Sequence, residues 1–492
     1  MTTGQDQATD RGRRSITVGI DIGTTSVKAL AVGDGGVVVA RSRIPHRIIH
    51  ASADHMEHDA RAAWRRGPQR ALSALRQAVA GSEGGSEGGV DVAGICVAGM
   101  VPSLTAVDRR GIPRTPGLLY GDMRGRAVGK TPTDTAEAGA MADAEGFLAW
   151  TAGEMPDAHG YWPAQAVATH ALTGHAVIDT AVTSSLGGLH RAGRWNDELL
   201  DRLGVDPARL PRVAPTGQHT GELRRGLRRA ETTASPRPGW DDSAAAVAGG
   251  TIDAFCDQIV AGADQVGDVL VIFGATLIVW VVTDTWVEVP GLWTVPHTAP
   301  GRVLIGGPSN AGALFVDWAR SMLRHPRGRI PVGDGRSGDP RRVPLWLPYL
   351  RGERVPFHDT SLRAGLFDLD ITDGPSDVSR AAYEASGFVV RSIIERSGVV
   401  ARRVVASGGG TKVDAWMAAM ADTTGLPVDA VAVPEGAALG AAFLARMAAG
   451  LEPSLDGSRA WARQGRRVRP DPAWQDASSR RFERFVALGS GP

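Results

Sequence analysis

The residues best suited to phosphate chemistry lie near the N-terminus, in the run Asp21-Ile22-Gly23-Thr24-Thr25-Ser26. A β-rich segment precedes this turn, so Asp21 should stand near the end of a strand. Glycine lets backbone approach an anion closely, and the N–H groups and hydroxyls of Thr24 and Thr25 can donate to phosphate oxygens. The Asp21 carboxylate can hold Mg²⁺ directly or through its waters, because Mg²⁺ takes oxygen ligands and keeps water. A β-hairpin turn with a capping aspartate explains the hexapeptide alone about as well.

Three further glycine-rich segments could serve the same chemistry. Gly249-Gly250-Thr251-Ile252 leads into a helical stretch that begins near Asp253, where a helix-capping carboxylate is the commoner explanation. Gly274-Ala275-Thr276 lies between two apolar strands and could close on phosphates, or could be a plain hairpin turn. Gly408-Gly409-Gly410 lies between a strand and a helix and could admit a nucleotide, although a flexible turn more often explains such a run. The order of these segments along the chain is the stronger signal.

The elements that must position these residues alternate between strands and helices, which predicts an α/β fold. The β-rich runs 16–22, 27–32 and 37–40 predict a meander of three strands, and 60–80 has helical spacing. A chain of 492 residues exceeds the size of one hydrophobic core, which stops growing near about 250–300 residues. The two Gly/Thr turns lie about half a chain apart, each flanked by apolar strands. This weak repeat suggests two related domains that face each other across a cleft.

Bulk composition is that of an ordinary globular protein, with 43% hydrophobic residues, 22% charged residues and a net charge of +1. This balance gives no general attraction to nucleic acid or anionic membrane. The polar segment 1–14 lacks the apolar core of a signal peptide, and the apolar run 269–282 is too short to span a bilayer. We therefore expect a cytoplasmic protein, with Cys96 and Cys256 as buried thiols.

In this order, the segments resemble the FGGY family of carbohydrate kinases, nearest to its xylulokinase-like members. The resemblance runs from about Ile16 to Ala448, and its most distinctive block is Leu347 to Pro356. Several short stretches also match at familiar spacing. They are Val18 to Lys28, Met56 to Asp59 with Trp64, Asp122 with Arg124, Ala171 to Gly174 with Asp179, Arg380 with Glu384, and Ala421-Asp422.

The resemblance implies an α/β fold of two actin-like (ribonuclease H-like) ATPase domains that face each other across a cleft. It implies ATP-dependent phosphorylation of a hydroxyl on a sugar or polyol, such as the ketopentose xylulose. By the family pattern, Asp253 is the general base and contacts the substrate, and Asp21 positions Mg²⁺. Met100 and Val101 fall in the sugar-contact stretch. The contacts to phosphate and nucleotide are implied at Thr24, Thr25, Gly274, Thr276, Gly409 and Gly410.

The same resemblance suggests four segments along the chain. A disordered N-terminus over 1–14 precedes a sugar-binding domain over 15–245, which carries the magnesium and phosphate turn. A nucleotide-binding domain with the catalytic base covers 246–450, and an extension over 451–492 packs on it or is partly flexible. The expected partner is a small-molecule sugar or polyol, with no nucleic acid and no membrane. The sequence does not fix the oligomeric state, and a homodimer is one state that it allows.

Three departures from the family pattern leave other functions open. Val101 and Pro102 stand where xylulokinase-like members usually carry a Met-His pair, Ala275 replaces a hydroxyl residue, and Asp368 replaces a glycine. The alternative to an active kinase is a catalytically impaired member that binds nucleotide or sugar as a sensor or scaffold. A chaperone-like or filament-forming ATPase is a third reading, which the block around Glu353 argues against. A kinase should consume ATP only when its sugar is present.

Overall fold

The computed structural model describes residues 13–52, 55–80, 89–124, 138–224, 240–323, 335–336 and 338–489. The chain forms two compact units. The first comprises residues 1–130, 140–256 and 437–454, and the second is formed mainly by 257–436 and 455–492. The N-terminal segment predicted to be disordered lies mostly outside the described residues, although Arg14 already begins the first strand.

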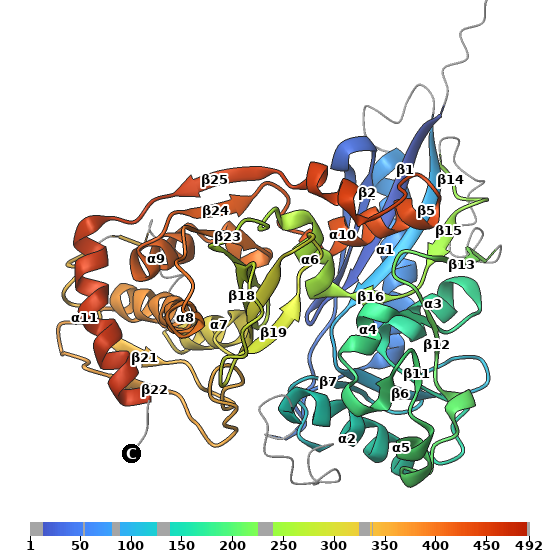
Figure 1. The fold of residues 1–492 in the computed structure, drawn as a ribbon, viewed down its shortest axis with the longest axis horizontal. Coiled ribbons are helices and arrows are strands. Elements are labelled where there is room, and N and C mark those ends of the chain that lie inside the picture. Colours follow the sequence, from blue (N-terminus) through green and yellow to red (C-terminus); the bar gives the residue numbers. More distant parts are fainter. Residues whose placement is uncertain are drawn as a thin grey trace, which may run out of the picture. The chain divides into compact units, whose positions relative to one another are not determined.

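The first unit is built around a mixed sheet with the strand order β13-β15-β5-β1-β2-β3 (Figure 1). The predicted antiparallel meander is present as β1, β2 and β3, and β5 runs parallel to β1. Two short strands, β15 and β16, also run parallel to β5. The bounds are β1 (Arg14–Ile22), β2 (Ser26–Val32), β3 (Val38–Pro45), β5 (Val90–Gly99), β13 (His219–Glu222), β15 (Ala246–Ala248) and β16 (Thr251–Ile252).

Helix α10 (Gly436–Ala448) packs directly against the backbone of this sheet. A Cβ atom added to Gly19 would lie 1.8 Å from the Ala438 carbonyl oxygen, and one added to Gly94 would lie 2.3 Å from that of Ala445. These glycines therefore permit a helix–sheet distance that no side chain would allow. The helix predicted over 60–80 begins as a π-helix (Arg61–Arg66) and continues as α1 (Gly67–Ala80).

A smaller sheet with the order β4-β7-β6-β8 lies elsewhere in the first unit. Further helices and a short strand complete the part of this unit that surrounds the candidate site. The bounds are β4 (Glu57–His58), β6 (Ser103–Val107), β7 (Gly117–Leu119), β8 (Gly160–Trp162), β9 (Val177–Asp179), α2 (Ala138–Glu154), α3 (Ala164–Thr173), α4 (Thr180–Ser184) and α5 (Asp197–Arg202).

The second unit repeats the strand arrangement of the first, with the order β19-β20-β18-β17-β23-β24-β25. Strands β17, β18 and β20 form an antiparallel meander, and β23 and β24 follow in parallel on the other side of β17. The repeat suggested by the two Gly/Thr turns is therefore a repeat of sheet topology. The bounds are β17 (Asp268–Phe273), β18 (Leu277–Thr283), β19 (Trp293–Pro296), β20 (Val303–Ser309), β23 (Arg403–Ser407), β24 (Val428–Val431) and β25 (Gln464–Val468).

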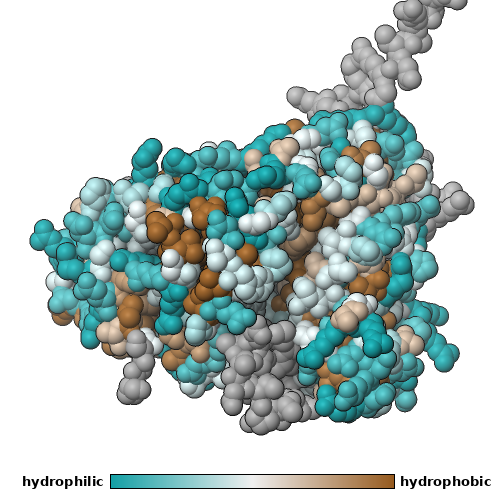
Figure 2. All heavy atoms as spheres, in the orientation of Figure 1, coloured by the Kyte–Doolittle hydropathy of each residue, from teal (hydrophilic) through white to brown (hydrophobic). Residues whose placement is uncertain are grey.

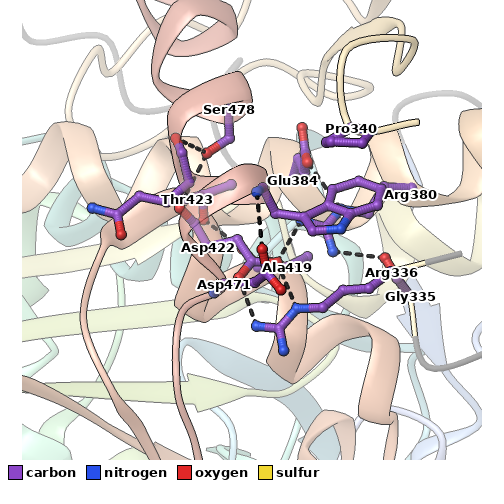
Figure 3. A network of polar contacts seen from close by, with 12 residues as sticks. Gly335, Arg336, Pro340, Arg380, Glu384, Ala419, Asp422, Thr423, Asp471 and Ser478 are labelled. Atoms are coloured by element: carbon purple, nitrogen blue, oxygen red, sulfur yellow. Dashed lines mark hydrogen bonds and ion pairs between the residues drawn. The ribbon is translucent and has the colours of Figure 1, made fainter. Parts of the chain in front are cut away.

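Helices α8, α9 and α11 of the second unit are joined by a buried network of charged side chains (Figure 3). Arg380 donates to Glu384 at 2.8 Å and to Asp422 at 2.9 Å, and Arg481 donates to Glu384 at 2.7 Å. Each buried carboxylate is thereby paired, which avoids the cost of an isolated buried charge. The bounds are α6 (Asp253–Ala261), α7 (Ala313–Met322), α8 (Pro375–Ser397), α9 (Asp414–Thr424) and α11 (Pro472–Gly489).

The visible face of the protein is mostly hydrophilic, with hydrophobic residues in smaller areas between (Figure 2). In the described part of the chain, no helix is both long enough and apolar enough to cross a membrane. Cys96 and Cys256 are buried free thiols, as predicted.

Candidate active site

Three neighbouring parallel strands of the first unit end at the same edge of its sheet. Ile22 of β1 and Ile252 of β16 both pair with Gly99 of β5. The residues that follow each strand are Gly23, Met100 and Asp253. Open α/β sheets bind their ligands beyond the carboxyl ends of the strands. The structure thus brings together three segments that the sequence singled out separately.

Asp21 lies in β1, one residue before this edge, and its side chain is buried. Lys28 Nζ donates to its Oδ2 atom at 3.1 Å. Its Oδ1 atom is also buried, and within the described residues it has no hydrogen-bond partner. A buried carboxylate oxygen without a donor is costly, so this atom is suited to a cation or to a water bound to one.

No group of three or more potential metal ligands from His, Cys, Asp and Glu occurs among the residues that the structure describes. The Oδ1 atom of Asp21, which has no partner in the described structure, could bind a cation as one carboxylate ligand, with water and substrate as further ligands. This matches the behaviour of Mg²⁺, which usually binds through one or two carboxylates and keeps several waters. The donor set at Asp21 therefore fits Mg²⁺.

Asp253 is the first residue of α6, and its Oδ1 atom accepts the Ala254 N–H at 2.7 Å. Burial, and then the negative charge of Asp21, raise the pKa of Asp253 to about 6, although Lys28 opposes this. The two carboxylates predicted to share one site are therefore close enough for one charge to act on the other. A pKa near 6 leaves Asp253 mostly ionised at neutral pH and makes it a stronger base than an ordinary aspartate.

Hydrogen bonds from the side chains of Trp64 and His58 fix the position of the turn with Thr24 and Thr25. Gly23 N–H closes the turn on the Ser26 carbonyl oxygen at 3.1 Å. Trp64 Nε1 donates to His58 Nδ1 at 3.0 Å, and His58 Nε2 lies 2.8 Å from the Thr24 carbonyl oxygen. His58 must therefore carry its proton on Nε2, and burial lowers its pKa to about 4, so it stays neutral.

The hydroxyls of this turn are placed differently from each other. Thr24 Oγ1 lies 3.1 Å from the Tyr120 hydroxyl, whereas the Thr25 residue is exposed. In the sequence, His58 and Trp64 stood out only as part of a stretch that matches the family. Thr24 is 34 residues from His58 and 96 residues from Tyr120, so no local pattern predicted these two contacts.

The stretch that carries Met100 and Val101 is anchored from α3. Gln165 is fully buried, and its Nε2 donates to the carbonyl oxygens of Gly99 at 2.7 Å and Met100 at 3.3 Å. Met100 is buried and Val101 is partly exposed. Gln165 therefore fixes the backbone of the predicted sugar-contact stretch. No pattern in the sequence indicated this role for Gln165.

Asp179 supports the segment that leads to Asp253. Its backbone N–H donates to the Gly250 carbonyl oxygen at 2.8 Å, and its side chain caps α4 by accepting the Val182 N–H at 3.1 Å. Burial raises the pKa of Asp179 to about 6. The double glycine before Asp253 is thus held by β9.

In the second unit, two glycine turns follow neighbouring parallel strands. Ile272 of β17 pairs with Ser407 of β23, so the turn 274–276 and the run 408–410 lie at the same sheet edge. A Cβ atom added to Gly409 would meet nothing within 4 Å, and one added to Gly274 would meet only the Thr276 carbonyl oxygen at 3.3 Å. Backbone at both glycines is therefore open to an approaching group.

The triple glycine is more ordered than the flexible turn that such a run commonly indicates. Gly408 has φ +91°, and a Cβ atom there would lie 2.7 Å from the Phe273 carbonyl oxygen. Gly409 and Gly410 begin a 3₁₀ helix that ends at Lys412, with Gly409 exposed and Gly410 buried. Gly408 is thus required by local packing, whereas Gly409 leaves space beside the backbone.

The repeated sheet, with its strand-edge turns, is the two-domain arrangement of the actin-like ATPase fold, which solved structures of sugar kinases share. Profiles of the FGGY family of carbohydrate kinases match the chain twice, the N-terminal domain over residues 16–152 and the C-terminal domain over residues 269–449. The chain belongs to the FGGY family of carbohydrate kinases.

Individual relatives agree with this assignment. The chain is 24% identical to xylulose kinase of Escherichia coli strain K12 over 464 residues, which cover 89% of this chain and 91% of the relative. The crystal structure of xylulose kinase from Rhodospirillum rubrum aligns with a TM-score of 0.71 and 26% identity, over 96% of this chain and 98% of that one. Gluconate kinase from Lactobacillus acidophilus aligns with a TM-score of 0.77 and 20% identity, over 97% and 98%.

Proposed function

We propose that this carbohydrate kinase transfers the terminal phosphoryl group of ATP to a hydroxyl of a ketopentose or related polyol, with Asp253 as general base. The observation that carries this proposal is that Asp253 and Asp21 lie at the same sheet edge, where burial and the charge of Asp21 raise the pKa of Asp253 to about 6. In this reaction, the Asp253 carboxylate accepts the proton of the attacking hydroxyl as the hydroxyl oxygen bonds to the terminal phosphorus, and the bond from that phosphorus to the bridging oxygen breaks to release ADP. Phosphoryl transfer otherwise requires positioning and charge neutralisation more than covalent chemistry.

We assign Asp21 to Mg²⁺, because its Oδ1 atom is buried without a partner in the described structure. When bound, Mg²⁺ would supply positive charge against the phosphate oxygens. The N–H groups and hydroxyls of Thr24 and Thr25 donate to phosphate oxygens in this proposal. Gly274 and Thr276 contact phosphate from the second unit, where backbone is open, and Gly409 with Gly410 flanks the nucleotide.

The acceptor is the least determined part of the proposal. Related proteins are named for xylulose and for gluconate, so family membership alone does not choose between them. Val101 and Pro102 offer no polar side-chain group to a sugar hydroxyl. A site that lacks such a contact discriminates weakly through it, which argues against assuming that the acceptor is xylulose. Ketopentoses and pentitols are the first candidates by family resemblance alone. We place the reaction in the cytoplasm, where ATP and free sugars are present.

The alternative function is a sensor that binds nucleotide or sugar without turnover, and the loss of a hydroxyl at Ala275 favours it. One test separates the two functions. ADP release by the purified protein is measured against a panel of ketoses, aldoses and polyols, with the Asp253→Ala variant as the control. We expect ATP consumption only with particular acceptors, and a loss of ~10²–10⁴-fold in the variant. Binding of MgADP with no turnover on any acceptor would favour the sensor. Turnover by Asp253→Ala equal to that of the wild type would show that Asp253 is not the general base.

A further inference from the structure

The most distinctive block of the sequence, Leu347 to Pro356, contains a buried carboxylate with no part in the chemistry described above. The Glu353 residue is 2% exposed. Its Oε1 atom accepts the backbone N–H groups of Asn310 at 2.8 Å and Arg354 at 2.7 Å. Its Oε2 atom accepts the Ser309 hydroxyl at 2.8 Å. Both oxygens are thus committed to protein donors, and two of the three donors lie outside the block.

Those two donors belong to the connection between β20 and α7. Ser309 is the last residue of β20, and its Oγ also accepts the Ala311 N–H at 3.1 Å. The Asn310 side chain donates back to the Gly352 carbonyl oxygen at 2.9 Å. The block around Glu353 and the connection 309–311 therefore hold each other through contacts on both sides. Glu353 is the central acceptor of this arrangement.

The other end of the connection contacts the turn assigned to phosphate. At the start of α7, Ala313 N–H donates to the Gly274 carbonyl oxygen and Leu314 N–H to that of Ala275, both at 3.0 Å. A Cβ atom added to Gly312 would lie 2.3 Å from the Thr276 carbonyl carbon. No free space separates the first turn of α7 from the turn 274–276. A shift of one must therefore move the other.

We propose that Glu353 is a positioning residue for the nucleotide, which sets the place of the turn 274–276 through Asn310 and the start of α7. This inference rests on the proposed contact of Gly274 and Thr276 with phosphate. Two carbonyls of the turn are committed to α7, so the direction of its N–H groups depends on where that helix begins. Phosphoryl transfer depends strongly on such placement.

The hydrogen bonds to Glu353 require an acceptor at this position more than they require a negative charge. Burial raises the pKa of Glu353 to about 7, while the three hydrogen bonds from Asn310, Ser309 and Arg354 lower it. An acceptor that keeps these donors satisfied is needed, because an unpaired buried N–H group is costly. A neutral amide can fill much of this role, whereas an apolar side chain of similar length cannot.

The test compares Glu353→Met with Glu353→Gln by calorimetric titration with MgADP in the absence of any acceptor sugar. Methionine removes every acceptor, and glutamine keeps one oxygen for the two backbone N–H groups. We expect the Kd for MgADP to rise roughly ten- to a hundredfold in Glu353→Met, with most of the loss recovered in Glu353→Gln. Hydrogen exchange should quicken at the Ala313 and Leu314 amides in Glu353→Met only.

A matched control is Glu384→Gln, which weakens another buried glutamate of the same unit. Glu384 is held by Arg380 and Arg481 within the network of Figure 3. This variant should lower the unfolding temperature and leave the Kd for MgADP unchanged. If Glu353→Met does not fold, Ser309→Ala removes one donor to Glu353 together with the acceptor of the Ala311 N–H, and it should weaken MgADP binding to a smaller extent.

Several results would overturn the proposal. One is an affinity of Glu353→Met for MgADP equal to that of the wild type, or the same result in Ser309→Ala if Glu353→Met does not fold. Another is a loss of MgADP affinity in Glu384→Gln as large as that in Glu353→Met. Failure of the proposed function is seen separately, as an absence of ATP consumption with every acceptor. The MgADP titrations and the exchange rates do not depend on that outcome.

Discussion

Replacing Asp253 with asparagine should make the protein less active and, at neutral pH, more stable. The amide keeps the oxygen that accepts the Ala254 N–H at 2.7 Å, so the start of α6 is preserved. It removes the carboxylate that would accept the proton, and loss of a general base typically lowers the rate by ~10²–10⁴-fold. It also removes a buried negative charge beside Asp21, which is unfavourable in the folded protein.

The size of the stability gain follows from the pKa of Asp253. Burial and the charge of Asp21 raise it from 3.8 to about 6, so the folded protein binds this proton more tightly than the unfolded chain does. Wild-type stability therefore falls as the pH rises through this interval, by ~3 kcal/mol for about two pKa units at ~1.4 kcal/mol each. The Asp253 side chain keeps some contact with solvent, so this figure is an upper bound.

Urea unfolding of wild type and Asp253→Asn, in EDTA to exclude divalent cations, measures the gain directly. The difference in free energy of unfolding should be near zero at pH ~4 and approach its maximum above pH ~7. Each protein serves as its own control, because all other titrating groups are shared. A difference that does not change with pH, or a less stable variant at neutral pH, would refute the raised pKa of Asp253 that burial and the charge of Asp21 are expected to cause.

Three further predictions concern the two strand edges. Asp21→Asn should raise the Mg²⁺ concentration needed for half-maximal activity, and unchanged dependence in a Mg²⁺ titration would count against its role. His58→Leu leaves the Thr24 carbonyl oxygen without its donor at 2.8 Å and should raise KM for ATP, whereas His58→Gln, which can still donate, should raise it less in steady-state kinetics. Gly409→Asp places a carboxylate in open space and should weaken MgADP binding by repulsion without lowering the unfolding temperature, while Gly409→Ala should bind more tightly than Gly409→Asp.

Local features of the site could be predicted from the sequence, because strand period and turn chemistry are encoded over a few residues. The strands on either side of Gly23 and Gly274 are examples. The contacts that orient these turns could not be found in this way. His58 and Thr24 are 34 residues apart, and Gln165 and Gly99 are 66 apart. Their meeting depends on the packing of whole elements, which no local pattern records.

The position of Asp253 shows the same limit more sharply. The strand that precedes it, β16, contains only two residues, which is too short for a strand to be predicted from periodicity. Only the pairing of Ile252 with Gly99 places Asp253 at the edge where β1 also ends. The family resemblance suggested its role as general base, and the sheet register supplies the physical reason that a carboxylate there is near Asp21. Several residues matched by resemblance, such as Glu353, gained a definite set of contacts only from the fold.

The two units use one sheet topology but place different groups at the carboxyl ends of their strands. In the first unit these are the turn of Thr24 and Thr25 and two carboxylates, Asp21 and Asp253, which repel phosphate unless a cation or a proton intervenes. In the second unit they are the glycine turns at Gly274 and Gly409, where backbone N–H groups can approach an anion without opposing charge. One fold repeated twice therefore carries different groups at equivalent edges. In our proposal, the first edge serves a metal, a proton transfer and phosphate, and the second serves phosphate and the nucleotide.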